Sequence, residues 1–292
     1  MANRMENKFL SLGGKLIKGV RATKINTVGN GVSLVSLSDG SVHEADCVIC
    51  AIPPEITFEK LLSLPLPKEY KKAYNDHRAP RFSAIQAAYT CNLESLPFSS
   101  DIIFDLKNNE AKRLGANHLI LREFSHEKSF SREGKSIIQA MLLCDERTAR
   151  YYVNLKESDP EAYKRKKAEL DKGIRRLIYD TLPALSGKLE YLDLWTPATY
   201  KRFLGSECGS FMSFILPPAY LPKRRSCRVH GITGVFLATQ WAESVGGLPI
   251  AAAEGKRAAE EAAKLISKKA KDSKGFAAFK RKGGFKQRQI YN

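Results

Sequence analysis

One junction in the sequence has residue types that can hold an anionic or electron-rich ligand. Residues 234–240 form an apolar run that predicts a buried strand, and Gly246-Gly247 and then Pro249 follow before an alanine-rich helix. Glycine allows the backbone to approach a ligand closely, and the start of a helix presents unpaired N–H groups with a partial positive charge. A single Gly-Gly pair also occurs in ordinary strand–loop–helix turns, so that interpretation stays open.

Other chemistries have weaker support in the sequence. Cys47 and Cys50 match C-x-x-C, but they lie on a predicted strand, where residues three apart face opposite sides. No second cysteine pair stands at zinc-finger spacing, and the five histidines show neither H-x-H nor H-E-x-x-H spacing. Neither a G-x-S-x-G elbow nor a Walker-type phosphate loop occurs. We therefore expect apolar structural cysteines and no metal site.

The elements that would position the junction begin with a meander of short strands over residues 15–52. Asn30-Gly31 and Asp39-Gly40 predict hairpin turns, and the apolar run 45–52 predicts a strand covered on both faces. Pro53-Pro54 ends that strand, because proline donates no ladder hydrogen bond.

The middle of the chain predicts a mostly antiparallel sheet backed by helices. Apolar residues three, four or seven apart indicate an amphipathic helix over 161–182. The other predicted elements are short helices at 57–64 and 67–75, strands at 82–91, 117–124, 136–144 and 188–195, and a helix over 250–269.

Composition sets the class of protein. The 292 residues carry a formal charge of +17, and 43% are hydrophobic, which is enough for a packed core and excludes a disordered or fibrous chain. No apolar run approaches the roughly 20 residues of a membrane span, and six cysteines without a disulfide pattern favour a cytoplasmic protein. Residues 264–292 hold ten basic residues and one acidic residue. We expect a flexible basic tail over 269–292, either a solvated end or a contact for an anionic membrane or RNA.

Three segments resemble flavin-dependent amine oxidases and phytoene-desaturase-type oxidoreductases. LSLGGKLIKGVRATKINTVGNGVSLVSLSDGSVHEADCVICAIPP (10–54) is similar to the meander and A-D-x-V-I-x-A-x-P strand of the FAD domain. GVFLATQWAESVGGLPIAAAEGKRAA (234–259) resembles the C-terminal flavin segment of that family. WTPATYKRFLGSECGSFMSF (195–214) is similar to the T-P…G…G-S-x-x-G stretch of the phytoene dehydrogenase branch.

The resemblance implies an α/β (α+β) fold with two interleaved domains. An incomplete FAD-domain part is expected at 1–62 and 226–268, and an inserted, mostly antiparallel substrate domain at 63–225, with the basic tail at 269–292. In such a fold the strands at 45–52 and 234–240 lie side by side, although they are far apart in sequence.

The resemblance also implies FAD as cofactor and a hydride transfer between FAD and an organic, apolar substrate. We expect walls of the substrate site at Tyr89, Met141, Phe211 and Phe214, and no catalytic base can be named. The positions that match the flavin-contacting residues of the family are Ala22, Ala51, Pro53, Thr239, Gln240, Trp241, Gly246, Gly247, Leu248 and Pro249.

The chain departs from the family pattern in two ways. Thr239, Val245 and Ile250 stand where glycines are usual, and no strand–G-x-G-x-x-G–helix segment for the FAD pyrophosphate occurs. We therefore expect the C-terminal half of a flavin-dependent oxidoreductase, truncated or split, with a separate partner chain that carries the N-terminal FAD-binding half. The alternative is a non-catalytic remnant that acts as an interaction module through its basic tail. The substrate and the reaction direction stay open, and a lipid-like substrate would place the chain at the membrane periphery.

Overall fold

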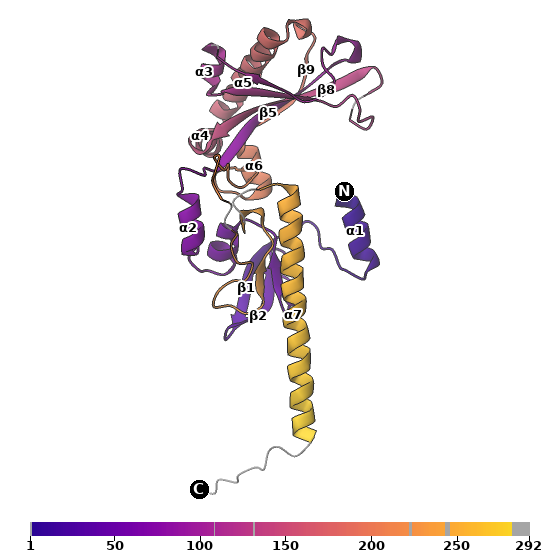
Figure 1. The fold of residues 1–292 in the computed structure, drawn as a ribbon, viewed down its shortest axis with the longest axis vertical. Coiled ribbons are helices and arrows are strands. Elements are labelled where there is room, and N and C mark those ends of the chain that lie inside the picture. The colour runs from indigo at the N-terminus through magenta and orange to yellow at the C-terminus, as the bar shows by residue number, and fades with distance from the viewer. Residues whose placement is uncertain (1, 108, 131, 222–223, 243–245, 282–292) are drawn as a thin grey trace. The chain divides into compact units, whose positions relative to one another are not determined.

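The computed structural model describes residues 2–107, 109–130, 132–221, 224–242 and 246–281. The chain forms two compact units (Figure 1). Unit 1 comprises residues 1–66, 226–238 and 254–292, and unit 2 comprises residues 67–225 and 239–253. The family resemblance predicts 239–253 in the FAD-domain part, whereas the contacts within the structure group these residues with unit 2.

Unit 1 contains the expected meander. Strands β1 (Ala22–Val28), β2 (Gly31–Leu37) and β3 (Val42–Glu44) form an antiparallel sheet in that order. Both predicted hairpin turns are confirmed, and Gly29 and Gly40 in them have positive φ, a conformation that only glycine adopts at little cost. The first strand is shorter than predicted, because residues 15–21 are irregular and pairing begins at Ala22.

The predicted meeting of two distant segments is confirmed in unit 1. Strand β4 (Val48–Cys50) pairs in parallel with β10 (Val235–Leu237), and Ile49 lies opposite Phe236. Phe236 packs with Cys227, Ala258 and Ala262, and the two alanines belong to helix α7 (Leu248–Arg281). One face of this small parallel sheet is therefore covered by α7.

Helix α7 starts close to the predicted position but does not end at Lys269. It continues to Arg281, so the expectation of a nonhelical tail is wrong for residues 270–281. Alanine and lysine are strong helix formers, and residues 270–281 contain three alanines and three lysines. The rest of the predicted tail, 282–292, lies outside the described residues. Unit 1 also contains helix α1 (Ala2–Ser11), which was not predicted, and a π-helical turn, η1 (Ile56–Leu61).

Unit 2 is built on a five-stranded antiparallel sheet with the strand order β6-β7-β8-β5-β9. All four strands predicted here are confirmed, and the short strand β6 was missed. The strands are β5 (Phe82–Asn92), β6 (Ile102–Asp105), β7 (His118–Glu123), β8 (Lys135–Asp145) and β9 (Glu190–Trp195).

Two long helices, α4 (Glu146–Ser158) and α5 (Pro160–Thr181), cover one face of this sheet (Figure 1). Helix α5 is the predicted amphipathic helix, and its side chains Leu170, Ile174 and Leu177 are buried in the core against the sheet. The remaining elements are α2 (Lys68–Tyr74), α3 (Asn109–Leu114), α6 (Pro197–Leu204), η2 (Leu93–Ser95), η3 (Pro183–Leu185) and η4 (Gln240–Ala242). Within the part of the chain that the structure describes, no helix has both the length and the apolar character that crossing a bilayer requires.

Candidate functional site

The candidate site is built on the other face of the unit 2 sheet, opposite α4 and α5, which we call the wall face. Along β8, residues alternate between the fully buried side, which faces α4 and α5, and a half-buried side. On the half-buried side, strand register places four side chains in one row, from Ile120 through Met141 and Gln86 to Trp195. This row supplies apolar surface with one amide at its centre.

Tyr200 of α6 is bonded to this row. Its hydroxyl oxygen accepts hydrogen bonds from Gln86 Nε2 and from Trp195 Nε1, the latter at 2.9 Å. Burial raises the pKa of Tyr200 to about 12, while the bonds from Trp195 and Gln86 act in the opposite direction. The phenol is therefore protonated at neutral pH. Both bonds use lone pairs of the oxygen, so the phenolic proton remains for a further acceptor.

Aromatic rings extend the wall beyond Tyr200. Phe211 stacks on Tyr200, with the ring centroids 5.0 Å apart. It also makes an edge-to-face contact with Phe82, with the ring centroids 5.4 Å apart. The structure thus brings two predicted wall residues, Met141 and Phe211, to one region of unit 2. Tyr89 is different: it is fully buried on the opposite face and donates to Asp171 of α5, so the expectation that it forms a wall is wrong.

The position of α6 follows from local sequence. Thr196 caps the helix with its side chain, Pro197 occupies the first turn, and Gly205 ends it with a φ of 75°. Gly209 then passes so close to the start of α6 that a Cβ there would lie 2.1 Å from the Pro197 carbonyl oxygen. The loop that follows α6 contains the G-S-x-x-G stretch, residues 205–209, and this stretch packs back against the start of α6.

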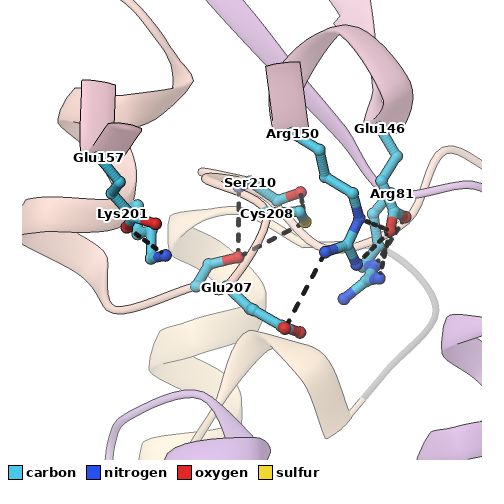
Figure 2. Close-up of polar contacts among 9 residues, drawn as sticks. Arg81, Glu146, Arg150, Glu157, Lys201, Glu207, Cys208 and Ser210 are labelled. Atoms are coloured by element: carbon cyan, nitrogen blue, oxygen red, sulfur yellow. Dashed lines mark hydrogen bonds and ion pairs between the residues drawn. The ribbon is translucent and has the colours of Figure 1, made fainter. Parts of the chain in front are cut away.

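Polar contacts anchor the same loop (Figure 2). Ser206, Cys208 and Ser210 are buried, and Cys208 Sγ lies 3.1 Å from Ser210 Oγ. On the α4 side, Glu146 accepts from the buried Arg81 at 2.6 Å and from Arg150 at 2.7 Å.

Arg150 Nη1 also lies 4.0 Å from Glu207 Oε1. Ser83 Oγ of β5 donates a hydrogen bond to the carbonyl oxygen of Gly209 at 2.6 Å. These contacts tie the loop between α6 and Phe211 to β5 and α4.

The predicted glycine junction is joined to this wall by one side chain. Gln240 Nε2 donates to the carbonyl oxygen of Phe211 at 3.2 Å, and Gln240 Oε1 accepts from the Gly247 N–H at 3.0 Å. A Cβ at Gly246 would lie 2.5 Å from the backbone nitrogen of Ser213, so only glycine fits there. The junction therefore packs directly against residues 211–213.

The neighbours of Gln240 have different environments. Thr239 and Trp241 are buried. The centroid of the Trp241 ring lies 5.6 Å from that of Tyr74 and 5.5 Å from that of Phe214. Trp241 thus anchors the junction in the interior of unit 2. By contrast, Leu248 at the start of α7 is 75% exposed.

The other three predicted flavin contacts lie in unit 1. Ala22 is the exposed first residue of β1, while Ala51 and the buried Pro53 directly follow the carboxyl end of β4. Ligands of parallel α/β sheets bind beyond the carboxyl ends of the strands, which is where Ala51 and Pro53 lie. Burial raises the pKa of the neighbouring Cys50 thiol to about 11, so this cysteine is not a thiolate at neutral pH.

Two further features lie away from the predicted residues. A cavity of about 640 Å³ in unit 1 is lined by Ser226, residues 228–236, Asn30 and part of α7, and contains none of the predicted flavin contacts. Over the described ranges, no group of three or more His, Cys, Asp or Glu side chains is arranged to hold a metal ion.

Comparison with known proteins places the chain in a family. The model of the flavin containing amine oxidoreductases matches residues 1–263. The chain belongs to this family. Its mixed α/β fold agrees with that of a protein from Pyrococcus furiosus, with a TM-score of 0.51 and 16% identity over 89% of this chain and 51% of that one.

Two other solved structures are similar to this chain with lower TM-scores. An oxidoreductase from Methanosarcina mazei has a TM-score of 0.48 and 16% identity, covering 82% of this chain and 48% of that one. Cyclohexylamine oxidase from Brevibacterium oxydans has a TM-score of 0.46 and 15% identity, covering 84% and 48%. The chain spans about half the length of these structures. No curated protein matches it.

Membership in the flavin containing amine oxidoreductases implies a flavin cofactor, and the junction in unit 2 fits one. Gly247 has a φ of 108°, and a Cβ there would meet nothing closer than 3.8 Å, so the backbone is open to a flat ring. The first amides of α7 have no helical carbonyl to bond, and they can face the electron-rich edge of a flavin.

Three residues of the wall face were not predicted from the sequence: Gln86, Trp195 and Tyr200. Trp195 and Tyr200 lie in the T-P segment that carries the family resemblance, so that segment was the signal available. Gln86 is a polar residue in an otherwise apolar strand, and its buried amide bonded to Tyr200 is the corresponding signal in β5.

Proposed function

We propose that the chain is the C-terminal half of an FAD-dependent oxidoreductase that transfers a hydride between an apolar organic substrate and FAD. The substrate wall of this proposal consists of the unit 2 residues described above. The family resemblance assigns the flavin ring to the glycine junction of unit 2 and assigns the adenine and pyrophosphate end to Ala22, Ala51 and Pro53. The FAD ring, when bound, provides the hydride acceptor or donor.

The Gln240 bridge is the observation that carries this proposal. It fixes the glycine junction, where the family resemblance places the flavin, against the carbonyl of Phe211. Phe211 in turn stacks on Tyr200 of the substrate wall. One set of contacts within unit 2 therefore connects the predicted cofactor segment to the predicted substrate surface.

The side chains of the wall have separate tasks in this proposal. Met141, Phe82 and Phe211 present apolar surface that excludes water from the reacting carbon. Tyr200, protonated and held by Gln86 and Trp195, offers its remaining proton to a polar atom of the substrate and so orients it. No side chain of the described wall is assigned as a general base.

The dinucleotide-binding half would come from a partner chain. The 292 residues contain no G-x-G-x-x-G segment. We propose that this partner holds the pyrophosphate, and that the two chains together bind FAD.

The visible absorbance of bound flavin tests the proposal. The chain is purified alone and together with the polypeptide encoded beside it, and the pair is expected to be yellow. Gly246→Ala should reduce the bound flavin of the pair, because the new methyl group meets Ser213 N. Gly255→Ala on α7 is the matched control, since nothing lies within 4 Å of its Cβ. Absence of flavin in both preparations would instead favour the non-catalytic remnant.

A further inference from the structure

The cavity of unit 1 has no role in the proposed function. Its volume of about 640 Å³ lies within the range of small-molecule sites in proteins. It is lined by the loop over residues 228–236 and by side chains of α7, all of which belong to unit 1. Because it shares no residue with the predicted flavin contacts, a ligand in this cavity would be distinct from the flavin.

The loop over residues 228–236 is fixed by backbone hydrogen bonds. Val229 N donates to Val235 O at 3.2 Å, which closes the loop on itself. Thr233 N donates to Asn30 O at 2.6 Å, and Asn30 lies in the turn between β1 and β2. These bonds hold the loop against the meander, so the cavity is a built feature of unit 1.

Part of the cavity lining is apolar. Val229, Val235 and Phe236 line it and are buried. Leu265 of α7 also lines it and packs against the cluster that contains Phe236. An apolar group placed here would displace water from apolar surface, which favours its binding.

Other side chains in the lining carry charge. Arg228, Lys264 and Lys268 are the cations, and Glu261 is the one acidic residue among the described residues that line the cavity. Glu261 accepts from Lys264 Nζ at 2.8 Å and from Arg228 Nε at 2.7 Å. The hydrogen bonds from Lys264 and Arg228 lower the pKa of Glu261, so its carboxylate is ionised at neutral pH and holds both cations beside the cavity.

Lys268 gives the lining an excess of positive charge. It follows Lys264 by one helical turn and is exposed, and no ion pair is recorded for it within the described ranges. Three cations and one carboxylate leave a net charge of +2, without counting His230. A phosphate monoester carries a charge of about −1.5 to −2 at neutral pH, so it matches this lining better than a carboxylate does.

We propose that this cavity binds a phosphate monoester that carries an apolar group. The phosphate meets Lys264, Lys268 and Arg228, which recognise it by charge and hydrogen bonding. The apolar group lies against Val229 and Phe236. Because the cavity and the flavin contacts share no residue, this binding is independent of the proposed function and can be measured on the chain without flavin.

Isothermal titration calorimetry of the full chain with hexyl phosphate tests the ligand class. Hexyl phosphate is expected to bind at least about tenfold more tightly than ethyl phosphate, because four further methylene groups leave water. It should also bind at least about threefold more tightly than hexyl sulfate, which carries a single negative charge. Equal affinities for hexyl and ethyl phosphate, or no binding of hexyl phosphate, would overturn the proposal.

Two glutamine variants of α7 test the position of the site. Lys268→Gln should weaken hexyl phosphate binding by about threefold to tenfold, because it removes a cation from the lining. Lys256→Gln is the matched control: it removes the same charge from an exposed position about 18 Å away along the helix, outside the lining. Its affinity should stay within about 1.5-fold of that of the unmodified chain. Equal weakening by both variants would show that the phosphate does not bind in this cavity.

Vesicles identify the source of the phosphate monoester. At about 0.5 M NaCl, contacts between exposed charges are screened, whereas a headgroup inside the cavity is screened less. A chain retained on phosphatidic acid vesicles at this salt concentration binds a lipid headgroup. A chain released from them that still binds hexyl phosphate has a soluble monoester as its ligand. Equal retention on phosphatidylglycerol vesicles, whose phosphate is a diester, would contradict the assigned chemistry.

Discussion

At the residue scale, the amide of Gln240 satisfies two backbone groups from segments far apart in sequence. Its oxygen accepts from Gly247 and its nitrogen donates to Phe211. An amide is the side-chain group that can do both at once, because it has a donor and an acceptor on one planar end. The glycine junction therefore depends on this residue for both of these hydrogen bonds.

Replacing Gln240 with leucine should loosen the junction. Both backbone groups lose their partner, so the free energy of unfolding is expected to fall by about 1–3 kcal/mol. The Gly247 amide should also exchange faster with solvent. Gln240→Glu keeps the acceptor for Gly247 and loses the donor to Phe211, so it should have an intermediate effect. Unchanged Gly247 exchange in the leucine variant would contradict the assigned bridge.

The six cysteines should differ sharply in reactivity. Five are buried, and burial raises the pKa of Cys50 to about 11 and that of Cys144 to about 12. Because the raised pKa keeps these thiols protonated at about pH 8, they should not react with a thiol reagent in the native chain. Cys47 is only partly buried and should react first. Titration with a chromogenic disulfide in the native and denatured chain, with Cys47→Ser as control, measures this.

At the element scale, the loop after α6 depends on Gly209. Its φ is 68°, and a Cβ would lie 2.1 Å from the Pro197 carbonyl. Gly209→Ala should therefore lower the free energy of unfolding by at least about 3 kcal/mol. Gly187→Ala shares the positive φ, at 73°, but meets no atom within 4 Å, so it should cost only about 1–2 kcal/mol. Urea unfolding compares the two, and equal losses would show that the contact with Pro197 is unimportant.

Elements with strong periodicity could be predicted from the sequence. The helix over 161–182 and the strands at 82–91 and 136–144 were found because each has a clear apolar period. Helix α4 was missed, because its buried face consists mainly of Ala149, Tyr152 and Val153 among polar residues. Strand β6 is only four residues long, too short to show alternation.

The candidate site could be predicted only in part. The glycine junction was visible because Gly246 and Gly247 form a local pattern with the helix that follows. The row Ile120–Met141–Gln86–Trp195 was not visible, because strand register depends on turns and bulges between distant segments. The same reason explains Tyr89, where the sequence left open which sheet face it occupies.

At the scale of the whole molecule, the charge of +17 should make binding to anionic surfaces dependent on salt. Lys264, Lys268 and Lys271 are exposed on α7, and each lysine near an anionic membrane contributes about 1 kcal/mol. We predict that the chain sediments with phosphatidylglycerol vesicles at about 0.05 M NaCl and is released at about 0.5 M. Neutral phosphatidylcholine vesicles are the control, and binding to anionic vesicles that salt does not weaken would contradict this electrostatic contact.

The two faces of the unit 2 sheet have a consequence for how this protein can change over generations. Along β8, every second side chain is buried between the sheet and α4 or α5, while its neighbours are half-buried on the wall face. Mutations of the first set threaten folding, whereas those of the second set mainly change the surface that the proposed function assigns to the substrate. Tolerance to substitution should therefore rise and fall with every residue along this strand. A new ligand preference could evolve on one side without weakening the scaffold on the other.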